Sequence, residues 1–182
     1  MLSTEQPVPD HRIEDLFVEL DRQVTSRRLP PIHRWLSAAE GQIDIRIARD
    51  GTWYHEGVAF TRPALVRLFS TVLLREGDSY FLVSPHEKLR IVVEDVPLLA
   101  LDFETRGAGE YSELLFSTNG GDLVVASHEH PIALRAGRPY LGVRDGLDAL
   151  IIRSAFYRLM DHAVEQDGRP CLFSRGACFF LD

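Results

Sequence analysis

The sequence predicts an α+β fold whose core is a duplicated β-β-α-β-β unit. The first observation is that residues 49–82 and 144–173 share one order: Arg-Asp-Gly, an extended stretch, a helix, a glycine-containing break and a strand. The second observation is a residue-by-residue match of the two helices at an offset of 91. The matching residues are Arg62, Ala64, Arg67 and Leu68, and then Arg153, Ala155, Arg158 and Leu159. Duplication places two similar surfaces face to face, so we expect a ligand at the seam between them.

Residues 1–39 are predicted to form an N-terminal tail, a helix and a connector. The first nine residues are polar and contain two prolines, so we expect disorder there. Asp10 is the expected N-cap of a helix with apolar residues at helical spacing. These residues are Ile13, Leu16, Phe17, Leu20 and Val24. Pro30-Pro31 ends the helix, because proline cannot continue one.

Residues 40–79 form the predicted first repeat unit. Isoleucines alternate with polar residues from Ile43 to Ile47, which is typical of a half-buried strand. Asp50-Gly51 predicts a turn, with a return strand over residues 53–60.

Thr61 is the expected N-cap of the helix in this unit, with Pro63 in its first turn and Gly77 at its end. Its predicted apolar stripe is Leu65, Leu68, Phe69, Val72 and Leu73.

Residues 80–182 form the predicted second unit, which is rich in short strands. The expected strands are 80–83, 89–93, 96–105, 111–118, 122–127, 132–135, 140–143 and 147–152. A helix follows with Phe156 and Leu159 on its apolar face, Asp167-Gly168 ends it, and a hairpin turns at Arg175-Gly176. This succession of strands and a helix resembles a pleckstrin-homology-like barrel, an analogy of topology that carries no function by itself.

Composition limits the function classes. The 20 basic and 27 acidic side chains give a net charge of −7, which disfavours non-specific nucleic-acid binding. The N-terminus does not resemble a signal peptide, and no segment reaches the roughly 18 apolar residues of a membrane helix. We therefore expect a cytoplasmic protein that does not enter a membrane, with both cysteines reduced.

Two residue pairs in loops and strands are candidate ligand contacts. Lys88 is the only lysine beside 19 arginines, which suggests a specific need for a compact ammonium. One interpretation makes Lys88 an anion clamp oriented by Glu87, and the other makes both charges the solvated tip of a hairpin. Trp53 and His55 share one strand face, either to contact a nucleotide base or as a core tryptophan with a satisfied histidine.

Arginines form a second set of candidates. Arg62 and Arg153 start the two repeat helices, where the helix dipole does not favour a cation, so each needs an acidic partner or a bound anion. Arg138 and Arg144 flank the strand of Tyr140 and are further anion candidates.

Catalytic and metal-binding patterns are weak. Glu94-Asp95 are neighbours in a strand, so their side chains point to opposite faces. His128-Glu129-His130 resembles part of a metal site but lacks an evident third ligand. We find no phosphate-binding loop, nucleophile elbow or zinc-protease motif, and we expect no catalytic residue, metal or cofactor.

Several strings of residues carry a family resemblance. They are Trp53-Tyr54-His55-Glu56-Gly57, Pro85-His86-Glu87-Lys88, Val93-Glu94-Asp95-Val96-Pro97 and residues 139–147. Over roughly residues 31–181 the chain resembles the bacterial family called domain of unknown function 1285 (DUF1285). The resemblance implies a duplicated α+β core, a pleckstrin-homology-like second half, a cleft that holds a nucleotide-like ligand and a part in signal transduction. It implies no reaction.

The leading hypothesis is a non-catalytic protein that binds a small anionic, nucleotide-like ligand between its repeats. Lys88 with Arg62, Arg138 or Arg144 would neutralise the ligand, and Trp53 or Tyr140 would stack on it. The first alternative is a metal-dependent phosphohydrolase using Glu87, Glu94 or Asp95. The second alternative is a protein–protein interaction module that binds a signalling partner.

Overall fold

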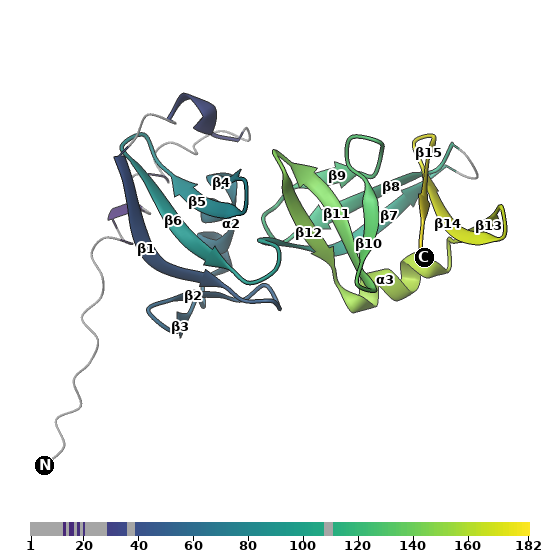
Figure 1. Cartoon of the computed structure of the whole chain (residues 1–182), viewed down its shortest axis with the longest axis horizontal. Coiled ribbons are helices and arrows are strands. Elements are labelled where there is room, and N and C mark those ends of the chain that lie inside the picture. Colours follow the sequence, from purple (N-terminus) through teal and green to yellow (C-terminus); the bar gives the residue numbers. More distant parts are fainter. Residues whose placement is uncertain are drawn as a thin grey trace, which may run out of the picture.

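Two units lie side by side along the longest axis of the molecule (Figure 1). The computed structural model describes residues 13, 15, 16, 18, 20, 29–35, 39–107 and 111–182. The protein is mostly β, with helices packed against curled sheets, so the predicted α+β class is confirmed.

The first unit is built on sheet A. Its elements are η1 (Ile32–Arg34), β1 (Ala39–Ile47), β2 (Trp53–His55), β3 (Val58–Ala59), α2 (Pro63–Thr71), β4 (Leu73–Glu76), β5 (Ser79–Val83) and β6 (Glu87–Val93). The strand order is β3-β2-β1-β6-β5-β4, with β1 and β6 parallel and the other pairs antiparallel.

The second unit contains sheets B and C. Its elements are β7 (Leu98–Arg106), β8 (Glu113–Thr118), β9 (Leu123–Val125), β10 (Ile132–Arg135), β11 (Arg138–Arg144), β12 (Leu147–Ile151), α3 (Arg153–Met160), β13 (Val164–Gln166), β14 (Arg169–Ser174) and β15 (Ala177–Phe180). Sheet B has the order β10-β11-β12-β7-β8-β9, and sheet C has the order β13-β14-β15. The parallel pair here is β12 with β7.

The N-terminal segment packs on this framework through Leu16 and Leu20, which are helical and buried in the core. The predicted tail at residues 1–9, the N-cap at Asp10 and the apolar residues Phe17 and Val24 lie outside the described residues.

The first helix differs from its prediction at both ends. Its N-cap is Arg62, which makes no capping hydrogen bond through its side chain, so Thr61 is not the cap. The helix ends at Thr71 rather than at Gly77, because Leu73 and Leu74 pair with Leu82 and Phe81 in the β4–β5 hairpin. The predicted apolar stripe therefore spans a helix and a strand.

The return strand of the first unit is also divided. Glu56 and Gly57 have positive φ values and form a tight turn between β2 and β3. This turn lengthens the first copy relative to the second, where β12 runs directly toward α3.

The predicted boundary between residues 79 and 80 falls inside the β4–β5 hairpin and separates no sheets, since β5 and β6 belong to sheet A. In the second unit α3 is followed by sheet C. The pleckstrin-homology-like interpretation of this unit stays a prediction.

The duplication itself is confirmed. Each copy has an Arg-Asp-Gly turn, a helix and a hairpin, and the hairpin glycines Gly77 and Gly168 both have positive φ. The copies differ in strand pairing. β6 pairs with β1, whereas its counterpart β15 pairs only with β14 among the described strands.

Both Arg-Asp-Gly turns lie at the seam between the units. Gly51 of the first turn packs on Leu99 of β7. At the second turn, Arg75 Nη1 donates a hydrogen bond of 2.9 Å to the carbonyl oxygen of Gly146. The repeated turns thus position the two units against each other.

Replacing Gly51 with alanine is expected to destabilise the protein by about 2 kcal/mol, because the new methyl group overpacks the seam. A Cβ at Gly51 would lie 2.5 Å from Leu99 Cδ1, at a φ of +84°. Gly57→Ala is the matched control, since Gly57 has a φ of +79° and no atom within 4 Å of its Cβ position. Urea unfolding midpoints measure the difference, and equal losses in the two variants would contradict tight packing at Gly51.

Candidate functional site

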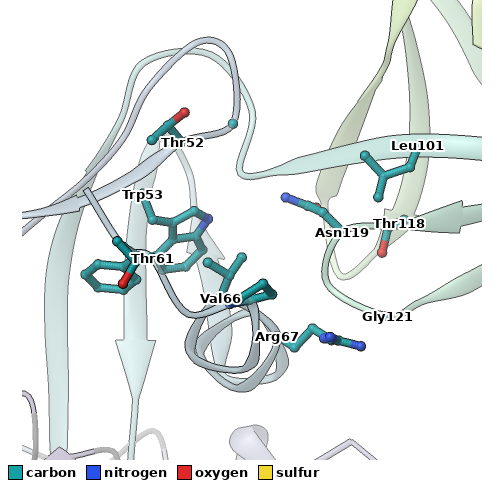
Figure 2. Close-up of a pocket in the computed structure, with 12 residues that line it drawn as sticks. Thr52, Trp53, Thr61, Val66, Arg67, Leu101, Thr118, Asn119 and Gly121 are labelled. Atoms are coloured by element: carbon teal, nitrogen blue, oxygen red, sulfur yellow. The ribbon is translucent and has the colours of Figure 1, made fainter. Parts of the chain in front are cut away.

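A cavity of about 500 Å³ lies between the two units (Figure 2). The first unit supplies residues from the β1–β2 turn, β2, the approach to α2 and α2 itself. These are Gly51, Thr52, Trp53, Phe60, Thr61, Pro63, Val66 and Arg67. The second unit supplies Leu101, Thr118, Asn119 and Gly121. The position agrees with the seam expected from the duplicated sequence.

Trp53 forms the inner wall of the cavity. Its ring is buried and packs against Phe60 and Phe69, with ring centroids 6.1 and 6.4 Å apart. Its indole nitrogen is also buried, and no described residue accepts a hydrogen bond from it. Figure 2 shows this nitrogen on the side of the ring that faces Asn119 across the cavity. Trp53 therefore places a hydrogen-bond donor that has no acceptor among the described residues beside the cavity.

Asn119 supplies a second donor from the opposite wall. Its Oδ1 accepts a 2.9 Å hydrogen bond from the backbone nitrogen of Leu99, which fixes the amide and leaves Nδ2 to face the cavity (Figure 2). Asn119 falls between the expected strands 111–118 and 122–127, so the sequence indicates only a connecting residue at this position. A signal was present, because Asn119 is the only asparagine in the chain.

Arg67 gives the cavity a positive edge. Its side chain is exposed on α2 and extends toward Gly121, and no described carboxylate pairs with it. Among the described lining residues none is an aspartate or glutamate. The polar groups that converge here are therefore mainly donors, and Phe60, Val66 and Leu101 form the apolar remainder.

Lys88 and Glu87 lie away from this cavity, at the start of β6. Lys88 is only 5% exposed, and its Nζ lies 2.9 Å from Glu40 Oε1 and 2.6 Å from Glu76 Oε2. The hydrogen bonds that Lys88 donates to Glu76 and Glu40 raise the pKa of Lys88 above its usual value. The geometry therefore gives Lys88 a stabilising role inside the first unit, where its charge is already balanced, and neither of the two sequence interpretations described this.

His55 and Arg62 are near the cavity without lining it. His55 is half-buried on β2, where it pairs with Ile45 and Val58. Arg62 is exposed between Thr61 and Pro63, two residues that do line the cavity. No described carboxylate pairs with Arg62, so the acidic partner expected for this arginine is not found in the described part of the chain.

The remaining arginine candidates are engaged in internal ion pairs. Arg138 Nη1 lies 2.5 Å from Asp95 Oδ2, and the Tyr140 hydroxyl donates to the same carboxylate at 3.0 Å. The guanidinium carbon of Arg135 lies 3.8 Å from the centre of the Tyr140 ring. Arg144 Nε donates to Asp122 Oδ1 at 2.9 Å. The structure thus brings only Trp53, flanked by Arg62, to the cavity.

Glu94 and Asp95 diverge as predicted for neighbours in an extended chain. Glu94 pairs with Arg46 of β1, whereas Asp95 pairs with Arg138 of β11. In the described part of the chain, no group of three or more His, Cys, Asp or Glu side chains is arranged to hold a metal ion. No helix among the described residues has the length and apolar content to cross a membrane.

The fold and cavity define a class: two-unit α+β proteins with a duplicated core and a cavity at the seam. Residues 30–96 match the N-terminal domain, and residues 97–181 the C-terminal domain, of the family described as a domain or protein of unknown function, DUF1285. The chain therefore belongs to the DUF1285 family.

Two solved structures are similar. A DUF1285 family protein from Silicibacter pomeroyi DSS-3 is 46% identical with a TM-score of 0.82, over 88% of this chain and 91% of that chain. A DUF1285 family protein from Shewanella baltica OS155 is 32% identical with a TM-score of 0.54, over 64% of this chain and 90% of that chain. No curated protein matches the chain.

Proposed function

We propose that this protein binds a small anionic molecule in the cavity between its units and does not transform it. The observation that carries the proposal is the buried Trp53 indole N–H, which has no acceptor among the described residues and faces the cavity. Asn119 Nδ2 faces it from the other unit, so a ligand acceptor group would contact both halves of the molecule.

The residues that line the cavity also indicate the chemical class of the ligand. Convergent donors and an exposed arginine favour a carboxylate, phosphate or other acceptor-rich head group. The apolar side chains of Phe60, Val66 and Leu101 favour a flat or branched apolar body. The volume of about 500 Å³ lies within the usual range of small-molecule sites.

A nucleotide-like ligand fits this description, with its base against Phe60 and Leu101 and its phosphate toward Arg67. A signalling role would follow if ligand occupancy alters how the two units meet, and the pleckstrin-homology-like interpretation of the second unit belongs to the same proposal. The phosphohydrolase alternative is less well supported, because Glu94 and Asp95 are paired away from the cavity. No feature of the described residues specifically favours the interaction-module alternative.

The test is a thermal-shift screen of the full chain against mononucleotides, cyclic dinucleotides and aromatic carboxylates. A ligand present at about 100 times its Kd should stabilise the folded protein by roughly 2.7 kcal/mol. We expect Asn119→Asp to weaken this ligand at least tenfold, since it keeps the acceptor for Leu99 N–H but replaces the donor by a negative charge.

The matched control is Gln166→Glu, an amide-to-acid change of equal charge on exposed β13, which should leave binding unchanged. Trp53→Phe removes the indole donor and keeps a ring. Binding that survives both cavity substitutions would refute the site, and a screen with no shift would refute the proposed function.

A further inference from the structure

The second repeat carries a cavity of its own beside its helix. It has a volume of about 490 Å³ and is formed by α3, the end of β12 and the start of β11. Its lining includes Ile151, Arg153, Phe156 and Tyr157. At the offset of 91, Ile151 and Tyr157 correspond to Phe60 and Val66, which line the seam cavity.

Arg153 is the charged group of this second cavity. Its Nη2 and Nε donate to the Tyr157 hydroxyl at 2.9 and 3.2 Å, and its guanidinium lies 5.4 Å from the centre of that ring. No described carboxylate pairs with Arg153. The charge is therefore held in place by a neutral partner and is left without a counter-charge.

The other walls limit what can bind. Arg138 also lines the cavity, but its charge is neutralised by Asp95. Pro139, Leu150 and Phe156 make the interior apolar, while Tyr157 is 58% exposed at the edge. The charge of Arg153 beside this apolar interior is complementary to a monoanion with a flat apolar body.

We propose that this cavity is a second ligand site, in which Arg153 binds the carboxylate or sulfonate of a small aromatic monoanion and Phe156 and Tyr157 contact its ring. The site lies wholly within the second unit, so it stands independently of the function proposed for the seam. It also gives a role to the arginine that begins the helix of the second repeat.

The experiment uses 2-naphthoate as the probe and the isotope-labelled full chain, followed by two-dimensional NMR. We expect saturable shifts in residues 150–157 and weaker, charge-independent binding of the neutral 2-naphthamide. Arg153→Ala should weaken naphthoate binding about tenfold, the effect of one charge-assisted hydrogen bond, and leave naphthamide binding unchanged. Tyr157→Phe, which keeps the ring but frees the guanidinium, should weaken naphthoate binding by a smaller factor.

Arg158→Ala is the matched control, because Arg158 lies on the same helix, is paired with Asp102 and does not line the cavity. Asn119→Asp should leave this binding intact, which separates the second site from the seam. An equal loss in Arg158→Ala, shifts confined to the surroundings of Trp53, or no saturable shift up to about 10 mM probe would each overturn the proposal.

Discussion

Replacing Arg144 with methionine is expected to lower the free energy of unfolding by about 3 kcal/mol, because it leaves the largely buried carboxylate of Asp122 without its counter-charge. Arg144 Nε donates to Asp122 Oδ1 at 2.9 Å, and Nη2 donates to the carbonyl oxygen of Ser70 in α2 at 2.8 Å. The two charged side chains are only 13% and 11% exposed. Methionine fills a similar volume, so the loss reports the ion pair and the hydrogen bond across the seam.

Arg135→Met is the matched control. Arg135 also lies on sheet B and forms a 2.9 Å ion pair, with Asp148, but 49% of its side chain is exposed. Exposed pairs contribute roughly 0–1 kcal/mol, so the urea unfolding midpoint should move little. The double variant Arg144→Met, Asp122→Asn should recover part of the loss, and strict additivity of the two single changes would contradict a coupled pair.

Arg144→Met should also weaken ligand binding in the seam cavity. Asp122 Oδ2 accepts a hydrogen bond from Thr118 Oγ1, and together these residues hold the β8–β9 turn that carries Asn119. Arg144 was predicted to contact the anion directly. Its position instead makes it a residue that orders the cavity wall, so its effect on affinity should accompany its effect on stability.

Local patterns predicted much of the fold correctly. The alternating isoleucines of β1, the turn at Asp50-Gly51 and the repeated helix needed only information within a few residues. The end of α2 was wrong because an apolar run from Val72 to Leu74 satisfies a helical stripe and a buried strand equally well. Only the pairing with β5 decides between them, and that depends on tertiary structure.

The candidate site was also predicted only in part, because local patterns do not show which distant residues meet. The duplication located the seam, and Trp53 was identified because it is a large ring on a predicted strand. Lys88 was singled out by its rarity, but rarity does not reveal a partner. The two carboxylates that pair with Lys88 lie 12 and 48 residues away in the sequence, and the local sequence does not predict that they converge on it.

That convergence gives the second large prediction: removing the carboxylates around Lys88 should cost more than removing Lys88. The double variant Glu40→Gln, Glu76→Gln leaves a buried ammonium without a counter-charge, for which we expect a loss of about 3 kcal/mol. Lys88→Met leaves the carboxylates instead. Their side chains are 68% and 46% exposed, so water can solvate them and the loss should be about 1 kcal/mol.

Urea unfolding at neutral pH measures both losses. Glu104→Gln, Glu165→Gln removes the same charge from exposed positions and serves as the control. Adding Lys88→Met to the Glu40, Glu76 double variant should restore stability, because no buried charge then remains. If Lys88→Met is as damaging as the double variant, the cost arises from packing on Phe81, whose ring centre lies 4.4 Å from Nζ, and not from the ammonium charge.

The pH dependence separates these causes further. The hydrogen bond from Lys88 holds the pKa of Glu40 below its ordinary value of 4.5. Its stabilisation is therefore present above that value and is lost as the pH falls through the lowered pKa. The pKa of Lys88 is raised above 10.5, so its contribution is complete below that value and disappears as the pH rises through the raised pKa. Lys88→Met should abolish the Glu40-linked loss in acid, and an unchanged acid profile would show that this carboxylate is not coupled to the lysine.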